Sequence, residues 1–172
     1  MKMSDLSLDM RQSGRDIILN GFIASPFVPR VLRWRLMFLI GMRVRRVAIN
    51  PKVWFGSREV EIGEGTFINY FCKFDGPVSV GRECNIGYDA LFCTGTHQIS
   101  LSGSRRRAGP YVCAPISIGY GVWIGARAVI MPGIAIGDGC VIGAGSIVTH
   151  DCEPNGMYRG VPARRVGELA RK

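Results

Sequence analysis

Large apolar residues recur at every sixth position along two stretches of the chain, 62–92 and 118–148. A period of six matches neither the 3.6 residues of an α-helical turn nor the long two-residue alternation of an ordinary strand. It therefore predicts very short strands joined by sharp corners. The twelve apolar anchors are Ile62, Ile68, Phe74, Val80, Ile86, Phe92, Ile118, Ile124, Ile130, Ile136, Ile142 and Val148.

Two further positions of the hexad carry a constant type of residue. The residue after the anchor is glycine in seven of the twelve repeats, and the residue four places after it is small or β-branched in all twelve. We interpret the large residue as filling a narrow prism, the small one as leaving room beside a corner, and glycine as taking backbone angles that other residues resist. The small positions are Thr66, Cys72, Val78, Cys84, Ala90, Thr96, Val122, Ala128, Ile134, Cys140, Ser146 and Cys152.

Three such hexads make one triangular coil, so the twelve predict about four coils, stacked at the roughly 4.8 Å spacing of neighbouring strands. Val47 and Val53 predict one further, imperfect coil before the first stretch, with one or more residues inserted near 57–60. The pattern therefore indicates an all-β fold, a parallel β-helix over residues 47–153.

The segments outside the repeat have a different composition. A loop at 98–115, with glycine, proline and three consecutive arginines, interrupts the repeat, and long irregular loops in compact domains are often functional. Residues 1–46 alternate arginine with large apolar residues, which predicts a helical cap on the first coil; the alternative is a basic helix on an anionic membrane surface. Residues 154–172 predict a C-terminal extension with a short helix around 165–172.

The composition restricts the expected location and partners of the protein. The chain has 172 residues, 47% of them hydrophobic, and a net charge of +9. No apolar signal segment opens it, and its longest N-terminal apolar run, 36–42, is far shorter than the roughly 20 residues of a membrane span. We therefore expect a soluble, cytoplasmic protein. The charge is compatible with phosphate-bearing partners, but the scattered basic residues form no recognisable nucleic-acid module, so no nucleic-acid partner is expected.

Cysteine and histidine usage argues against a metal cofactor. The six cysteines contain no C-x-x-C pair, and only two histidines are present, His97 and His150. The same shortage argues against a γ-type carbonic anhydrase, whose zinc takes three histidines. The cysteines at small inward positions are predicted to be buried packing thiols. They are Cys72, Cys84, Cys140 and Cys152.

His97 closes the hexad FCTGTH directly before the interrupting loop, at a corner outside the core. An imidazole with an ordinary pKa of about 6.5 can take a proton from a hydroxyl at neutral pH. His97 is therefore the candidate general base, and a surface histidine without a catalytic role is the alternative.

The segment 92–97 and the loop after it resemble the catalytic histidine motif of the galactoside, maltose and nodulation-factor O-acetyltransferases. The stretch 120–165 resembles the same superfamily through the series VWIG, PG, IGDG, IGAGS and PAR, and the two segments cover about two thirds of the chain. The resemblance implies a left-handed β-helix and an acetyl-CoA-dependent O-acetyltransferase.

By this resemblance, His97 deprotonates the acceptor hydroxyl, which then attacks the thioester carbonyl directly. The backbone N–H near Ala126 would donate to the oxygen of the tetrahedral intermediate. Asn69, in FINYFCKFDG, matches the asparagine that faces the catalytic histidine and helps to hold the acceptor. An asparagine in a left-handed corner is the alternative reading of Asn69.

Three residues near His97 in the sequence could change this mechanism, one as a nucleophile and two as groups that orient the histidine. A covalent route through Cys93 is conceivable because a thiolate is a capable nucleophile, although the family transfers the acyl group directly. Asp75 and Asp89 are the nearest carboxylates in sequence that could orient His97.

The resemblance also implies a binding site for acetyl-CoA. Trp123 offers a flat apolar wall for the pantetheine arm, with packing at a subunit interface as the alternative role. Small residues such as Ala144 let the arm lie close to the coils, and Arg164 can pair with a phosphate. His150 departs from the family, which usually places lysine or arginine there. The implied cofactor-binding residues are Trp123, Ala126, Ala144, Thr149, His150 and Arg164.

Assembly and acceptor follow from the family as well. Its members bury the flat faces of the prism by threefold assembly, so the resemblance implies a homotrimer with active sites between subunits. We expect a carbohydrate acceptor, such as a polysaccharide precursor or a nucleotide- or lipid-linked sugar. An antibiotic or other xenobiotic acceptor is the alternative, because the xenobiotic acetyltransferases share the C-terminal motifs. A non-catalytic structural β-helix is the alternative of another class.

Overall fold

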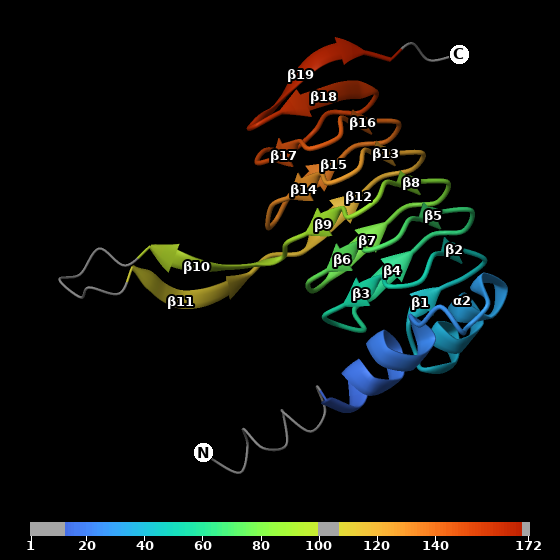
Figure 1. The fold of residues 1–172 in the computed structure, drawn as a ribbon. Helices are drawn as coiled ribbons and strands as arrows, with labels where there is room; N and C mark the ends of the chain where they lie inside the picture. Colours follow the sequence, from blue (N-terminus) through green and yellow to red (C-terminus); the bar gives the residue numbers. More distant parts are fainter. Residues whose placement is uncertain (1–12, 100–106, 170–172) are drawn as a thin grey trace.

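The structure, a computed structural model, describes residues 13–99 and 107–169. Its short strands stack into three parallel sheets that form the sides of a prism (Figure 1). The sheets have the strand orders β1-β4-β7-β12-β15, β2-β5-β8-β13-β16-β18-β19 and β3-β6-β9-β14-β17. Only the last pair of the second sheet, β18 and β19, is antiparallel. The predicted β-helix is confirmed.

Each coil takes one strand from each sheet, so five coils are complete. The first coil holds β1 (Arg43–Val44), β2 (Ala48–Ile49) and β3 (Trp54–Phe55), and the second holds β4 (Val60–Ile62), β5 (Phe67–Ile68) and β6 (Lys73–Phe74). The third holds β7 (Val78–Val80), β8 (Asn85–Ile86) and β9 (Leu91–Phe92). The fourth holds β12 (Ile116–Ile118), β13 (Trp123–Ile124) and β14 (Val129–Ile130), and the fifth holds β15 (Ala135–Ile136), β16 (Val141–Ile142) and β17 (Ile147–Val148). The twelve hexads supply four of these coils, and the first is the imperfect coil that Val47 and Val53 predicted.

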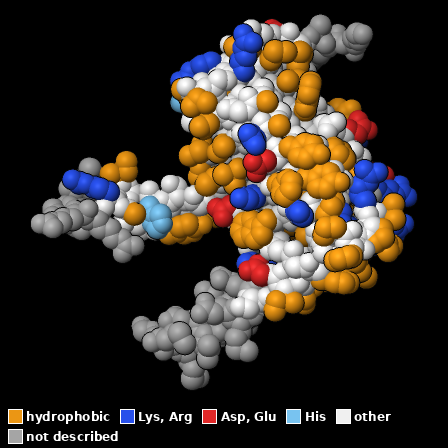
Figure 2. Space-filling view, viewed as in Figure 1, with side chains coloured by type: hydrophobic (Ala, Val, Ile, Leu, Met, Phe, Trp, Pro, Cys, Tyr) orange, Lys and Arg blue, Asp and Glu red, His pale blue; other side chains and the backbone are white. Residues whose placement is uncertain are grey.

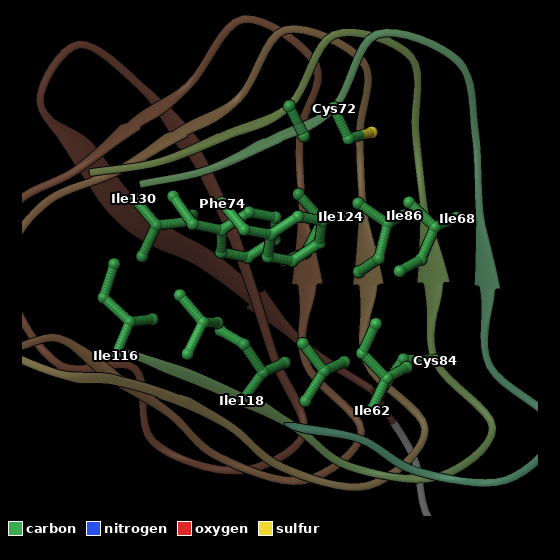
Figure 3. Packing of buried hydrophobic residues seen from close by; sticks show 14 of the residues in the cluster. Ile62, Ile68, Cys72, Phe74, Cys84, Ile86, Ile116, Ile118, Ile124 and Ile130 are labelled. Atoms are coloured by element: carbon green, nitrogen blue, oxygen red, sulfur yellow. The ribbon is translucent and has the colours of Figure 1, made fainter. Parts of the chain in front are cut away.

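The apolar anchors fill the prism. All twelve are buried, as predicted, and they stack coil upon coil (Figure 3). Phe55, Phe74 and Phe92 form a column of parallel rings, with centroids 5.3 and 4.5 Å apart. Phe74 therefore has an aromatic ring on both faces, and the column fills this part of the prism.

Eleven of the twelve small positions are buried, and the twelfth assignment was wrong. Thr96 is exposed, because the chain leaves the third coil after Phe92. The inward position that should follow Phe92 is filled by Ile116, where the chain re-enters the prism beside Val78. Thr94, two residues earlier, is buried instead.

The inward cysteines are packing thiols, as predicted. Burial raises the pKa of Cys72 to about 11 and the pKa of Cys152 to about 12, and it also raises the pKa of Cys84 and Cys140. These thiols are therefore protonated at neutral pH and act as small apolar side chains.

The glycines that follow the anchors serve a different purpose from the predicted one. None of them has a positive φ, and at each a Cβ atom would lie only 2.3–3.0 Å from the nearest atom of a neighbouring turn. They are required by close approach of successive corners. The left-handed conformation falls two residues later, at Gly65, Gly121, Gly133, Gly139 and Gly145, and also at non-glycine residues such as Phe71. The seven glycines that follow anchors are Gly63, Gly81, Gly87, Gly119, Gly125, Gly137 and Gly143.

The interruption of the repeat is a β-hairpin. Strands β10 (Gly95–Ile99) and β11 (Ala108–Cys113) pair antiparallel and project away from the prism (Figure 1). The loop was predicted to start at 98, but the chain departs before Gly95, and much of the segment is ordered strand. Residues 100–106, which include two of the three consecutive arginines, lie outside the described residues.

Helices cover the N-terminal end of the prism. The π-helix η1 (Asp16–Ile23) and the α-helix α2 (Arg30–Leu39) lie against the first coil (Figure 1). The first coil itself begins at Arg43, inside the segment 1–46 that the sequence assigned to the cap. Among the described residues, no helix is long and apolar enough to cross a membrane.

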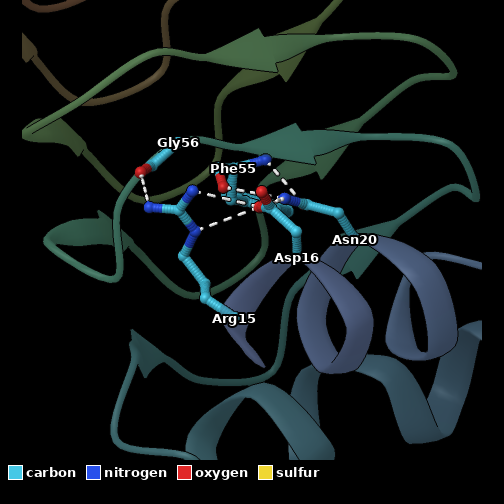
Figure 4. Close-up of polar contacts among 5 residues, drawn as sticks. All are labelled: Arg15, Asp16, Asn20, Phe55 and Gly56. Atoms are coloured by element: carbon cyan, nitrogen blue, oxygen red, sulfur yellow. Dashed lines mark hydrogen bonds and ion pairs between the residues drawn. The ribbon is translucent and has the colours of Figure 1, made fainter. Parts of the chain in front are cut away.

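The cap satisfies the open edge of the first coil. The Asn20 side chain donates to the Phe55 carbonyl at 3.0 Å and accepts from the Phe55 N–H at 2.9 Å, as a neighbouring strand would (Figure 4). Arg15 donates to the carbonyl of the next residue, Gly56. Unpaired edge groups of a sheet need such partners, so these contacts fix the cap on the coil.

Arg33 is the most deeply buried charge of the described residues. It is 2% exposed and donates to the carbonyls of Ile23, Ser25, Val28 and Ile49 at 2.5–2.9 Å. Burial lowers its pKa from the ordinary value. One guanidinium therefore ties η1, the linker to α2 and the edge of β2 together.

The C-terminal end is closed by strands, and the predicted helix around 165–172 is wrong. Strand β18 (Gly156–Gly160) continues the second sheet, and β19 (Ala163–Glu168) folds back on it. Tyr158 and Ala163 are buried over the last coil. A strand is favoured here because β18 covers the open edge of β16 and leaves an edge of its own, and pairing with β19 satisfies the backbone groups of that edge. Residues 170–172 lie outside the described residues.

Arg33→Met is expected to destabilise the protein by about 2 kcal/mol or more, because four buried carbonyls lose a charged donor. Thermal or urea unfolding followed by circular dichroism measures the loss. Arg35→Met is the matched control on the same helix, since Arg35 is exposed and donates only to the Val31 carbonyl of its own helix. Equal stability of the two variants would contradict the proposed role of Arg33.

Candidate active site

His97 lies on the projecting hairpin with one ring nitrogen fixed. Its Nδ1 is 2.9 Å from the carbonyl oxygen of Gly109 on the opposite strand. A carbonyl can only accept, so Nδ1 donates a proton to it, and in the neutral ring the lone pair lies on Nε2. The ring is exposed and meets the edge of Tyr111, its cross-strand partner, at a centroid distance of 5.7 Å. This is the tautomer that a general base needs.

The base of the hairpin holds the histidine in place. A Cβ at Gly95 would lie 2.3 Å from the Tyr111 hydroxyl oxygen, so only glycine lets the Tyr111 ring cross there. Asp75 accepts from the Gly95 N–H at 3.1 Å. Asp75 therefore fixes the backbone of the hairpin and does not contact the imidazole. Asp89 lies 3.7 Å from Arg127 at a different corner, so neither carboxylate orients His97.

Sequence reasoning missed the groups that position His97. Gly95, Gly109 and Tyr111 come from the segment where the hexad pattern stops, and the antiparallel register of a hairpin is not visible in a six-residue period. The sequence offered only a glycine two residues before His97 and another two residues before Tyr111.

The Cys93 thiol is poorly suited to nucleophilic attack. Partial burial and the nearby negative charge of Asp75 raise its pKa above the usual range. The sulfur donates to the Gly95 carbonyl oxygen at 3.3 Å, and the backbone of Gly95 offsets part of the rise in pKa. A protonated thiol is a weak nucleophile, so direct transfer is favoured over a covalent route.

Asn69 follows β5 at a corner of the prism, with its side chain already ordered. The Asn69 Oδ1 accepts from Asn50 Nδ2 and from the N–H of Tyr70, each at 3.0 Å. This orients the amide so that its Nδ2 remains available as a donor. The alternative reading is wrong, because Asn69 has no positive φ; the left-handed residue of this corner is Phe71, with φ of 65°.

The predicted site residues fall on two different edges of the prism. We call the corners that follow β2, β5, β8, β13 and β16 the second edge, and those that follow β3, β6, β9, β14 and β17 the third edge. Asn69, Ala126 and Ala144 lie on the second edge, with the N–H of Gly145 donating to the Ala126 carbonyl at 2.8 Å. The hairpin with His97 leaves from the third edge, where Thr149 and His150 also lie. Within one chain, sheet β3-β6-β9-β14-β17 separates the two groups.

The second edge offers a backbone donor and an apolar wall. The Ala126 N–H finds no hydrogen-bond acceptor among the described residues, so it is available to a ligand oxygen. Trp123, on the outer face of β13, is 58% exposed. Ala144 is exposed at the neighbouring corner, and its lack of a long side chain leaves the surface beside Ala126 open.

His150 and Arg164 come together at the C-terminal end. They line a hollow of about 330 Å³ with Tyr158 and Ala163. Arg164 is exposed and donates one hydrogen bond, to the Ala163 carbonyl. Thr149 Oγ1 and His150 Nδ1 are 2.9 Å apart. No group of three or more His, Cys, Asp and Glu side chains in the described ranges is placed to share a metal ion.

A prism of six-residue coils with a hairpin-borne histidine defines a class of hexapeptide-repeat solenoids. A family model described as the hexapeptide repeat of succinyl-transferase matches residues 115–150. A hexapeptide-repeat acetyltransferase of Vibrio cholerae, solved in complex with acetyl-CoA, superposes with a TM-score of 0.82 at 30% identity, covering 98% of this chain and 91% of that one. The chain belongs to the hexapeptide-repeat acetyltransferases.

Two further relatives carry names with sugar acceptors. The galactoside O-acetyltransferase of Escherichia coli is 36% identical over 124 residues, which cover 70% of this chain and 60% of that protein. A maltose O-acetyltransferase structure from Clostridium difficile has a TM-score of 0.83 at 26% identity, covering 96% of this chain and 89% of that one. In sequence, the chain spans 53% and 60% of the length of the first two curated relatives that it matches.

Cys93→Ala is expected to leave the rate of acetyl transfer within about threefold of the wild type, because a thiol held in its protonated form is not the nucleophile. Release of free CoA from acetyl-CoA, followed with a thiol reagent, measures the rate. Loss of activity with unchanged folding would return the covalent route to consideration.

Proposed function

We propose that the protein is an acetyl-CoA-dependent O-acetyltransferase that acts on a sugar hydroxyl. One observation carries the proposal: the Gly109 carbonyl holds Nδ1 of His97 as a donor, so Nε2 is the ring nitrogen that can accept a proton. The acetyl-CoA complex of the Vibrio cholerae relative and the names of the galactoside and maltose relatives support the co-substrate and the acceptor class.

The proposed reaction is a direct transfer. Nε2 of His97 takes the proton of the acceptor hydroxyl while the hydroxyl oxygen forms a bond to the carbonyl carbon of the thioester. The oxygen of the tetrahedral intermediate accepts from the Ala126 N–H. The carbon–sulfur bond then breaks, and the imidazolium returns its proton to the departing CoA thiolate. Trp123, Ala144, Thr149, His150 and Arg164 would hold CoA, with Arg164 pairing with a phosphate.

Aromatic side chains beside Asn69 support a carbohydrate acceptor. Tyr70 and Tyr88 stack with ring centroids 5.5 Å apart, and Phe71 lies 6.2 Å from Tyr70. Phe71 and Tyr88 are about half exposed, at 46% and 48%. A bulky aromatic residue with φ of 65° is costly, which points to a function for Phe71. Flat aromatic faces next to an amide donor suit the C–H face and the hydroxyl of a pyranose ring.

We also propose a homotrimer, because the two groups of site residues cannot meet within one chain. If the third edge of one subunit faces the second edge of its neighbour, the His97 hairpin comes opposite Asn69 and Ala126 of the next chain. Closed threefold symmetry repeats that contact three times. An antibiotic or other xenobiotic hydroxyl remains the second acceptor class, since the features around CoA do not depend on the acceptor.

His97→Ala is expected to lower the turnover of acetyl-CoA by about 10²- to 10⁴-fold, the usual contribution of a general base. Acetyl-CoA would be tested against a panel of galactosides, maltose, nucleotide sugars and chloramphenicol-like antibiotics, with thiol release as the readout. A rate within about threefold of the wild type would exclude His97 as the base, and the absence of turnover with every acceptor would favour a structural role.

Mixing two inactive variants is expected to restore part of the activity. In a trimer assembled from His97→Ala and Asn69→Ala chains, about one quarter of the interfaces combine an intact His97 with an intact Asn69 from different chains. The chains would be unfolded and refolded together, and light scattering would give the assembly. Each variant refolded alone is the control. No recovery in a mixed trimer would mean that one chain supplies both residues.

A further inference from the structure

The outer face of the cap is apolar. Helix α2 turns Arg33 and Met37 toward the coils and buries them. Positions 31, 32, 35, 38 and 39 lie on the opposite side, because residues three, four and seven apart share one face of a helix. We call the exposed apolar residues there, together with the preceding one in the linker, the outer cap face. They are Phe27, Val31, Leu32, Phe38 and Leu39, with exposures of 94, 62, 46, 53 and 77%.

Such a face is unusual on a water-soluble surface. An amphipathic helix of a globular protein normally turns its apolar stripe to the core, whereas α2 leaves most of its large apolar side chains outside. Contiguous exposed apolar surface marks a site of interaction with another molecule or a membrane. Phe27 is the most exposed large hydrophobic residue of the described chain.

The charge of the cap is almost entirely positive. Residues 13–48 contain seven arginines and one aspartate. Arg43 and Arg46 pair with Glu61 and Glu64 of the second coil. Arg30 and Arg45 are exposed and have no carboxylate partner within the described residues. Figure 2 shows hydrophobic side chains gathered over the N-terminal end, with basic side chains beside them.

An exposed apolar face surrounded by arginines fits a lipid surface better than a protein partner. Apolar side chains on one helix side, bordered by arginine, are the composition of helices that lie at a membrane interface. A second copy of the same face is disfavoured, because twofold contact would set arginines against arginines. Anionic headgroups complement this charge and attract basic residues that lie near the membrane surface.

We propose that the outer cap face binds the surface of an anionic lipid bilayer. Phe27, Phe38 and Leu39 insert below the headgroups, and neighbouring arginines meet the lipid phosphates. The cap lies at one end of the prism, so the hairpin and the opposite end of the coils remain in water (Figure 1). Binding of this kind requires no acetyl transfer, so it is independent of the proposed enzymatic function.

The test is sedimentation of the full chain with vesicles of phosphatidylcholine, with and without about a third of phosphatidylglycerol, at low and physiological salt. We expect binding to the anionic vesicles, weakening with salt, and little binding to neutral ones. The triple variant Phe27→Ser, Phe38→Ser, Leu39→Ser should bind at least about tenfold more weakly. Because all three side chains are exposed, this variant is expected to fold normally, which circular dichroism checks.

The control removes exposed apolar side chains from the other end of the molecule, Val161 and Val166, which are 68% and 46% exposed. The variant Val161→Ser, Val166→Ser should bind vesicles as the wild type does. The proposal is overturned if the wild type ignores anionic vesicles or if the triple variant binds like the wild type. It is also overturned if the triple variant changes only the size of the assembly, which would assign the face to a contact between copies.

Discussion

Backbone contact between successive coils is the constraint on which this structure depends. Each strand of the five coils is only two or three residues long, and in the inner coils it is hydrogen-bonded to the coils on both sides, so every coil must match the outline of its neighbours. At Gly125, a Cβ would lie 2.4 Å from the backbone nitrogen of Ala144 in the next coil. A side chain there would force the corners apart and break pairing in both coils. The six-residue period of the sequence reflects this backbone contact between coils.

The same constraint explains where the candidate catalytic group stands. A corner absorbs one extra residue, as between Phe55 and Ile62, which are seven positions apart and still pair in register. A longer insertion is ejected as a hairpin that leaves and re-enters at the same level. The hairpin with His97 does so, and its base is closed by the Ala114 N–H, which donates to the Thr94 carbonyl at 2.9 Å. An ordered pair of strands then supplies what an irregular loop would not, a backbone carbonyl opposite His97 that fixes its tautomer.

The sequence revealed the prism better than it revealed its ends. Anchors such as Ile124 were predictable because an inward position admits only apolar residues, and the period repeats that restriction twelve times. Thr96 was misplaced because counting by six was continued past the point where the chain leaves the prism. No residue type in the sequence marks that point. The strand β19 was taken for a helix because pairing with β18 depends on an open sheet edge, which is a property of the fold and not of the local segment.

The candidate site residues could be chosen from the sequence by their corner positions, but their grouping in space needed coordinates. A linear repeat does not show that Asn69 and His97 leave from different edges, since each simply follows a strand. Once the edges are known, the separation of His97 from Asn69 and Ala126 argues that one chain is an incomplete site. The flat sheet between them then becomes the surface along which copies must meet if the chemistry is to occur.

At the first coil, the cap helices use polar side chains to close the open edge of the solenoid. Sheet edges at Ile49 and Phe55 require hydrogen-bond donors and acceptors, and Arg33 and Asn20 supply them from the helices. Because α2 presents a buried guanidinium to the coil, its core-facing side is partly polar, and its remaining apolar residues are left to face outward. The exposed apolar face is therefore linked to the way in which the helices close the edge of the first coil. Such a face at the end of the stacked coils is suited to contact with the apolar interior of a membrane.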